Sequence, residues 1–339
     1  MRQLKPAARY AIVLGVIILF AGTTMPAATI QSEFTLVQTI QLKGVEGGLD
    51  HVIVDNKNQR LFLANKANNT LDIVDLKTGA LIQQVEGQQG VQGVAYAADL
   101  DRIFTTLGSG GFCNVFDGKD YKLLKTIKFK DDADNVRYLA RTHTVYVAHA
   151  ENALGVIDAN SFDVRADIKL PASAEGLQPE SVRPRLYLTT PQPSQVVVVD
   201  TDKNEVIGRF PVKGAGKAYA VAVDEPTQRL FVACRKSPAV VVLDSESGKE
   251  ITRIAIPDGV DDIMYDAERK RILTSCGEGF VAVIKVVDAN HYELVEKLPT
   301  VKDAKTCYFS PSDGKLYVAV PRQAGKDSPE IRVYQHQKQ

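Results

Sequence analysis

Residues 60–79 read RLFLANKANNTLDIVDLKTG, and this stretch carries the pattern that decides the fold. The run RLFLAN is rich in apolar residues, and the polar residues KANN separate it from a second run, TLDIVD. Short runs of this kind, bounded by turn-forming residues, are typical of antiparallel β-strands. The stretch therefore predicts two paired strands followed by a further turn at Lys77-Thr78-Gly79.

The first run recurs along the chain as RIFTTL from Arg102, TVYVAH from Thr144, RLYLTT from Arg185, RLFVAC from Arg229, RILTSC from Arg271 and KLYVAV from Lys315. Successive spacings are 42, 42, 41, 44, 42 and 44 residues, and each run is followed by a second β-rich run. A period of about 40–45 residues with room for four strands is typical of one propeller blade. The sequence predicts an all-β, seven-bladed β-propeller with four antiparallel strands per blade, as a single domain over residues 34–335.

The seventh repeat is incomplete, because only four residues follow the run at 330–335. The missing outer strand is present at the other end of the chain, where residues 34–42 read FTLVQTIQL and are similar to YKLLKTIKF from Tyr121. We expect the N-terminal strand to close the last blade, since closure removes the exposed sheet edges of an open array.

The N-terminal segment has the order of a secretory signal peptide. Three basic residues precede the apolar run YAIVLGVIILFAG at 10–22, and small residues follow at Ala27 and Ala28. The run is shorter than the roughly 20 residues that a membrane span needs. The sequence predicts a signal peptide over residues 1–28 and export to the periplasm or the extracellular space, with an uncleaved anchor as the alternative.

Composition sets limits on the class of protein. The 339 residues are 45% hydrophobic and 24% charged, which is ordinary globular usage and excludes a disordered chain and a polytopic membrane protein. Removal of residues 1–28 takes away three basic side chains, so the remainder has 38 basic and 41 acidic groups and a net charge of −3. A nucleic-acid-binding protein usually has the opposite balance.

The four cysteines show no CxxC spacing, so neither a zinc site nor a haem attachment is indicated. An oxidising compartment would permit disulfides, and the sequence leaves the pairing of these residues open. Two of them hold equivalent repeat positions, which favours small buried residues in matching places over a disulfide. The four are Cys113, Cys234, Cys276 and Cys307.

RLFLANKANNTLDIVDLKTG and RLFVACRKSPAVVVLDSESGKEI resemble the YVTN-type, YncE-like bacterial β-propellers. The resemblance extends over residues 34–335 and implies a seven-bladed propeller exported to the periplasm or cell surface. Some members of the family are labelled DNA-binding, and quinoprotein heavy chains and metal-dependent lactonases share the general architecture. Because similar blades serve many roles, the resemblance implies a fold and leaves the function open.

Candidate site residues follow from the phase of the repeat. The innermost strand of each blade lines the channel, and the starts of these strands surround one mouth together with the loops between the second and third strands. The first ring position is occupied by Asp50, Gln92, Asp134, Glu175, Tyr219, Asp261 and Lys305. The next position adds the polar residues His51, Asn135 and Asp262.

Converging carboxylates repel one another unless something neutralises them, which leaves three interpretations of this ring. A divalent cation such as Ca²⁺ could be held by oxygen ligands. A cationic organic ligand or the single Lys305 is the second possibility, and hydrogen bonds to loop backbone and water are the third. The predicted metal ligands are Asp134, Asn135, Glu175 and Asp261, and the predicted ligand-binding residues are Asp50, His51, Gln92, Tyr219, Asp262 and Lys305.

Three functions compete at this point. The sequence favours a monomeric exported binding or scaffold protein without chemistry of its own, its partner being a small molecule or a periplasmic protein, because no complete catalytic motif is present. The second is a metal-dependent, lactonase-like hydrolase that uses the acidic mouth, with His51 or Asp262 as the base. The third is single-stranded nucleic-acid binding through the loop face, where basic residues occur at Lys66, Arg235, Lys236 and Arg322.

Overall fold

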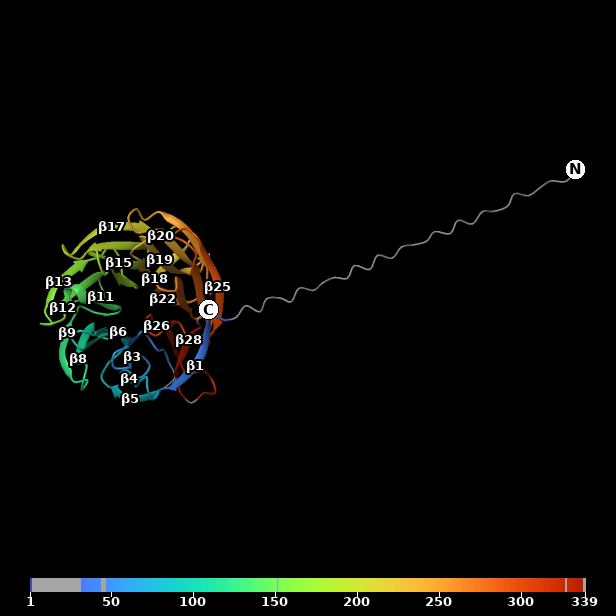
Figure 1. The fold of residues 1–339 in the computed structure, drawn as a ribbon. Helices are drawn as coiled ribbons and strands as arrows, with labels where there is room; N and C mark the ends of the chain where they lie inside the picture. The colour runs from blue at the N-terminus through green and yellow to red at the C-terminus, as the bar shows by residue number, and fades with distance from the viewer. Residues whose placement is uncertain (2–31, 44–46, 151, 327, 338–339) are drawn as a thin grey trace. The chain divides into compact units, whose positions relative to one another are not determined.

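The chain folds into seven four-stranded antiparallel sheets arranged in a ring, as the computed structural model in Figure 1 shows. The structure describes residues 1, 32–43, 47–150, 152–326 and 328–337. The predicted all-β, seven-bladed propeller is therefore confirmed. Apart from Met1, the predicted signal peptide lies outside the described residues. Within the part of the chain that is described, no helix is both long and apolar enough to cross a membrane.

Each blade is built from four strands that follow one another in the sequence, except in the closing blade. The innermost strands are β2 (Val52–Asp55), β6 (Val91–Ala97), β10 (Val136–Leu139), β14 (Leu177–Pro179), β18 (Gly216–Asp224), β22 (Val260–Asp266) and β26 (Thr306–Ser310). The second strands are β3 (Arg60–Asn65), β7 (Arg102–Leu107), β11 (Thr144–His149), β15 (Arg185–Pro191), β19 (Arg229–Lys236), β23 (Arg271–Cys276) and β27 (Lys315–Val320).

The outer half of each blade is equally regular. The third strands are β4 (Thr70–Asp75), β8 (Phe112–Asp117), β12 (Ala153–Asp158), β16 (Ser194–Asp200), β20 (Ala239–Asp244), β24 (Phe280–Val286) and β28 (Glu330–His336). The outermost strands are β5 (Ala80–Val85), β9 (Leu123–Lys128), β13 (Val164–Lys169), β17 (Glu205–Pro211), β21 (Glu250–Ala255), β25 (Tyr292–Pro299) and β1 (Phe34–Gln41). Blades are numbered one to seven from β2 to β26. A 3₁₀ turn, η1 (Ala140–Thr142), joins β10 to β11.

The N-terminal strand closes blade seven, as the incomplete last repeat predicts. Strand β1 pairs antiparallel with β28 from Phe34 opposite His336 to Gln41 opposite Glu330, with one irregularity between Leu36 and Gln38. The sheet order β1-β28-β27-β26 therefore combines both ends of the described propeller chain. The strand is one residue shorter than the run expected from the sequence.

Aromatic residues in the second strands fill the space between neighbouring blades. The third residue of this strand is aromatic in six blades and leucine in blade six, and all seven side chains are at most 1% exposed. Large rings at one repeated position supply most of the apolar area that holds blade against blade. These residues are Phe62, Phe104, Tyr146, Tyr187, Phe231, Leu273 and Tyr317.

The aspartate that ends most third strands forms the turn to the outermost strand. In blade one, Asp75 Oδ1 accepts hydrogen bonds from the backbone N–H groups of Lys77 and Thr78 at 2.8 and 2.9 Å. Asp200 and Asp244 make the same pair of contacts in blades four and five. Side chains that accept from the backbone two and three residues further on stabilise tight turns, which explains the recurring Asp in the sequence.

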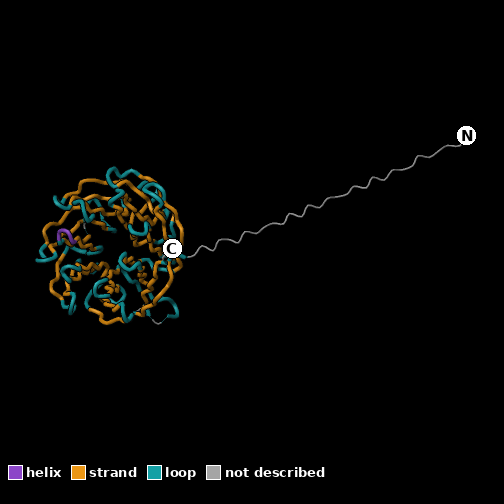
Figure 2. Tube along the Cα trace, in the orientation of Figure 1, coloured by secondary structure: helices purple, strands orange, loops and turns teal. Residues whose placement is uncertain are grey.

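The innermost strands contact one another around the full ring, whose course Figure 2 shows. The cavities that these strands line form a central channel. Their N-terminal ends lie at one mouth of this channel, next to the loops that connect second to third strands. This arrangement brings residues from all seven blades into one place, although they are about 42 residues apart in the sequence.

Candidate functional site

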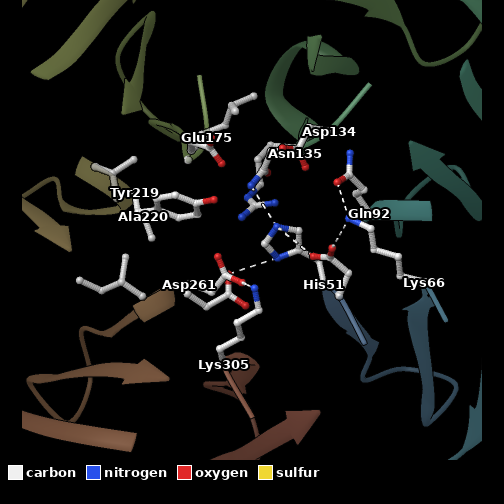
Figure 3. A pocket seen from close by; sticks show the side chains of 17 residues that line it. His51, Lys66, Gln92, Asp134, Asn135, Glu175, Tyr219, Ala220, Asp261 and Lys305 are labelled. Carbon is white, nitrogen blue, oxygen red and sulfur yellow. Dashed lines mark hydrogen bonds and ion pairs between the residues drawn. The ribbon is translucent and has the colours of Figure 1, made fainter. Parts of the chain in front are cut away.

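All ten residues that the sequence singles out line one cavity at the channel mouth (Figure 3). The cavity has a volume of about 110 Å³, and its described lining contains five carboxylates. Their placement together was predicted, whereas their roles in binding a metal or a ligand stay predictions. The lining also contains Arg137, Lys66 and the apolar residues Leu177, Val221 and Ile263.

Irregular backbone at the start of the inner strands turns the ring residues toward the channel. In blades five and six the register of the inner strand shifts around Tyr219 and Asp261, which have no partner in the ladder. In blade two the shift includes Gln92. Bulges commonly redirect side chains at functional positions. In the other blades the ring residue precedes the strand, as Asp50 precedes β2.

In three blades, a side-chain hydroxyl of the second strand donates a hydrogen bond to the backbone of the ring residue in the next blade. Thr106 Oγ1 donates to the backbone carbonyl of Asp134. Thr189 Oγ1 donates to that of Tyr219 at 2.6 Å, and Ser275 Oγ to that of Lys305 at 2.5 Å. These hydroxyls occupy the fifth position of the second strand in blades two, four and six, where the other four blades have alanine.

Glycines make this contact possible in two of the three blades. Gly93 N donates to Thr106 Oγ1 at 3.0 Å, and a Cβ atom at Gly93 would lie 2.4 Å from that oxygen. Gly176 stands in the same relation to Thr189, at 2.8 Å in each case. Any side chain at these two positions would therefore push neighbouring blades apart at the mouth.

His51 lies at the centre of the floor of the cavity and joins three blades. Its Nδ1 is 3.2 Å from Asp262 Oδ1, and its Nε2 is 3.2 Å from Asn135 Nδ2. Asp262 Oδ2 also accepts from the backbone N–H of Cys307 at 3.0 Å. Burial alone would lower the pKa of His51, but the Asp262 carboxylate outweighs it and raises the pKa to about 9. The same pairing keeps the pKa of Asp262 below its usual value despite burial.

A protonated His51 donates from both ring nitrogens, so its contact with Asn135 requires the amide oxygen on that side. Asn135 is only 4% exposed, and its Oδ1 has no hydrogen-bond partner as placed. If the amide is rotated by 180°, Oδ1 accepts from His51, and Nδ2 is then the atom without a hydrogen-bond partner. In either orientation, one polar atom of this buried side chain is left over.

Asp261 is neutralised by cations from two blades. Lys305 Nζ lies 2.8 Å from its Oδ2, and the Arg235 guanidinium contacts its Oδ1. Arg235 also stacks on the ring of Tyr219, with Cζ 3.2 Å from the ring centroid. The charge of Asp261 is thus compensated by these two side chains, so Asp261 is a poor ligand for an added cation.

On the opposite side of the mouth, Lys66 Nζ donates to Gln92 Oε1 at 2.7 Å and lies 3.7 Å from Asp50 Oδ2. Gln92 in turn donates to Asp132 Oδ1 at 3.0 Å. Burial raises the pKa of Asp50 to about 6, although His51 and Lys66 pull it down.

Among the mouth carboxylates, Asp134 has the fewest stabilising contacts with described residues. No hydrogen bond or ion pair joins its side chain to any described residue, and its pKa is raised to about 7 by burial and by the nearby charge of Asp50. Burial also raises the pKa of Glu175, while the hydroxyl of Tyr219 partly offsets the effect. The mouth therefore holds two poorly compensated carboxylates, Asp134 and Glu175, beside a floor that is positively charged.

The described side chains do not form a metal centre of the usual kind. Within residues 32–337 as far as they are described, no group of three or more His, Cys, Asp and Glu side chains converges on one point suited to a metal ion. The predicted ligand Asp261 is bound to Lys305 and Arg235, and Asn135 is bound to His51. The geometry gives the Ca²⁺ interpretation no support.

The four cysteines are buried free thiols. Burial raises the pKa of Cys113, Cys234 and Cys276 to about 12. The interpretation of Cys234 and Cys276 as small residues in matching core positions therefore holds, and neither is a nucleophile at neutral pH.

Comparison with known proteins supports this fold. The propeller has a TM-score of 0.77 to the WD40 repeats of RRP9, at 12% identity over 88% of this chain and 97% of that one. It has a TM-score of 0.72 to a chain of Kuenenia stuttgartiensis hydrazine synthase, at 16% identity over 82% and 94%. These likenesses define a WD40-like β-propeller and nothing finer.

Sequence relatives narrow the class. The chain is 27% identical over 195 residues to protein YncE of Salmonella typhimurium, and 24% identical over 214 residues to YncE of Escherichia coli K12. These matches include 56% and 61% of this chain, and the chain spans about half the length of either relative, 54% and 51%. No family model matches the sequence. The chain is a YncE-like seven-bladed β-propeller.

Proposed function

We propose that this chain is an exported binding protein, without catalysis of its own, whose channel mouth takes up a small polar ligand carrying a cationic group. The observation that carries the proposal is Asp134, a half-buried carboxylate that lines a cavity of about 110 Å³ and has no hydrogen-bond or ion-pair partner among the described residues. Buried carboxylates are normally paired, so an unpaired one that faces a cavity favours a cation from solution.

An organic cation suits this cavity better than a bare metal ion. The poorly compensated carboxylates, Asp134 and Glu175, stand in neighbouring blades, and the remaining acidic groups are paired with Lys305, Arg235, His51 and Lys66. An ammonium group can donate to two such carboxylates at once, because it has three N–H donors. The apolar side chains in the lining would contact the carbon part of the ligand.

The hydrolase alternative lacks a base in this arrangement. A general base must be unprotonated at the working pH, and a His51 with a pKa of about 9 is protonated at neutral pH. Asp262, the other candidate, is occupied by His51 and by the backbone of Cys307. Nucleic-acid binding is also less favoured, since Lys66 and Arg235 are engaged at the mouth rather than free for phosphate.

The test is binding of simple amines. The probes are ethanolamine and 1,4-diaminobutane, with 1,4-butanediol as the uncharged control, followed by calorimetry and thermal unfolding. A ligand at about 100 times its Kd adds about 2.7 kcal/mol of stability. We expect the amines to raise the Tm, more at about pH 8 than at about pH 5, because Asp134 and Asp50 are protonated at the lower pH.

Matched variants decide which carboxylate is responsible. Asp134→Asn should abolish the amine effect, whereas Asp120→Asn, which changes an exposed aspartate paired with Lys122, should leave it intact. Equal responses to diamine and diol, or to wild type and Asp134→Asn, would contradict the proposal. A Tm shift with Ca²⁺ that Asp134→Asn removes would return the metal interpretation to first place.

Export rests on residues 1–28 alone and needs its own test. We expect N-terminal sequencing of the protein from bacterial cells to begin near residue 29, with the protein in the periplasmic or extracellular fraction. A protein that begins at Met1 and stays in the cytoplasm would refute export.

A further inference from the structure

A second cavity of about 220 Å³ lies deeper in the channel, next to the mouth. His51 and Arg137 line both cavities, so these two side chains form the boundary between them. The deeper cavity is called the chamber below. Its chemistry differs from that of the mouth, and the proposed amine site makes no use of it.

The walls of the chamber are set by one row of residues, three positions beyond the ring on each inner strand. Six of the seven residues in this row are uncharged, and six of the seven line the chamber. Arg137 is the single charged member of the row. The seven are Ile53, Ala95, Arg137, Gln178, Ala222, Met264 and Tyr308.

The charge of the chamber is positive. Its described lining contains Arg137 and His51 but no aspartate or glutamate. The Arg137 guanidinium donates through Nη1 to the backbone carbonyl of Val136 at 2.9 Å, and it forms no ion pair within 4 Å with any carboxylate of the described chain. A guanidinium has five N–H donors, so most of this group has no acceptor among the described residues.

Such an arrangement favours the binding of an anion from solution. Burial lowers the pKa of Arg137, and the more distant charges of Asp262 and Asp134 offset only part of this effect. A charge away from bulk water normally has a partner of opposite sign. Here the cation stands at the boundary of a chamber with mostly apolar walls, and no described carboxylate lies within 4 Å of it.

We infer that the chamber binds a compact aromatic monocarboxylate, with its carboxylate on the Arg137 guanidinium and its ring against Tyr308, Met264 and the other apolar walls. The planar fork of arginine matches a carboxylate with two parallel hydrogen bonds. An apolar cavity of about 150 Å³ is enough to bind benzene, so a chamber of about 220 Å³ has room for a ring that carries one carboxylate.

The probe is benzoate, with benzamide as the uncharged control of the same shape. Binding is measured on the full chain by calorimetry and by saturation-transfer NMR. We expect benzoate to bind and benzamide to bind at least about tenfold more weakly, because only the carboxylate forms the charge-assisted pair. Equal binding of the two, or no binding of benzoate, would overturn the inference.

Two variants locate the site. Arg137→Lys keeps the charge but removes the fork and should weaken benzoate binding by about tenfold or more. Ala95→Leu narrows the chamber without changing any charge and should weaken benzoate to a similar degree. Arg102→Gln, which alters an arginine paired with Asp117 at 3.0 Å outside both cavities, is the matched control and should have no effect.

The readouts also separate this inference from the proposed amine site. Asp134→Asn should leave benzoate binding unchanged or slightly tighter, and Ala95→Leu should leave amine binding unchanged. Benzoate binding that survives both Arg137→Lys and Ala95→Leu would place the ligand elsewhere and refute the assignment. Failure of the amine test alone would refute only the mouth proposal.

Discussion

The mouth and the chamber occupy one channel, yet they have opposite chemistry. The described lining of the mouth has five carboxylates, and that of the chamber has none. Asp134 and Arg137 illustrate the contrast, since this anion and this cation, neither of them in a described ion pair, stand only three positions apart in one chain segment. A repeated blade fixes where side chains point, and single substitutions within each row then decide what each level of the channel can bind.

Opening the ring should have the largest effect, because both cavities depend on closure. A chain that lacks residues 34–42 loses β1, which pairs with β28 in the closing blade. We expect its urea unfolding to lose cooperativity and both amine and benzoate binding to disappear. A chain that begins at residue 32 is the control, and equally sharp unfolding of the two chains would show that closure is dispensable.

Asp262→Asn tests the floor that the two cavities share. Removing one partner of a buried ion pair costs about 3–5 kcal/mol, so we expect a decrease of this order in the free energy of unfolding at neutral pH. In wild type, the contribution of His51 is fully present below its unfolded pKa near 6.5 and is lost as the pH rises toward 9. The variant should lose this pH dependence.

NMR titration of the histidine ring checks the same point directly. The signal of His51 should titrate near pH 9 in wild type and below its usual pKa in Asp262→Asn, since burial then acts without the carboxylate. A titration midpoint that does not move would mean that Asp262 does not hold the charge of His51.

Thr106→Val should affect the mouth more than the chamber. It removes the donor to the carbonyl of Asp134 and the acceptor for the N–H of Gly93. Buried polar groups left without a partner cost about 1–3 kcal/mol, and amine binding should weaken while benzoate binding stays within error. Thr106→Ser keeps the hydroxyl and should behave like wild type in both assays.

The smallest effect is a gain in stability from Asp134→Asn. The pKa of Asp134 is higher in the folded protein, about 7, than in the unfolded chain. Wild-type stability should therefore rise as the pH falls through 7 and level off below the unfolded pKa near 3.8. The variant should unfold a few degrees higher than wild type at about pH 8, with no difference once both are compared at acidic pH.

Much of the architecture could be predicted because it depends on local periodicity. Alternating apolar runs and turn residues recur every 42 or so residues, and this pattern locates the strands, the closing strand and the ring positions. All ten predicted site residues do meet in one cavity. Strand ends differ by a residue in places, for example in β1, which ends at Gln41 where the sequence predicts Leu42.

The pairing within the ring could not be predicted. Whether Asp261 is free or neutralised depends on how Arg235 and Lys305 reach across blades, and the sequence does not encode those distances. Arg137 was missed, although a signal was present: it is the one charged residue in an otherwise uncharged row. Following the repeat to the third position beyond the ring would have found it.

The seam between β1 and β28 has one more consequence. Phe34 lies opposite His336, so the two ends of the propeller chain are neighbours in space. A short linker could join them, and the chain could then be opened at a loop between two other blades. Such a circular permutant would have every blade formed from consecutive strands, since the hydrogen-bonded sheets do not depend on where translation starts.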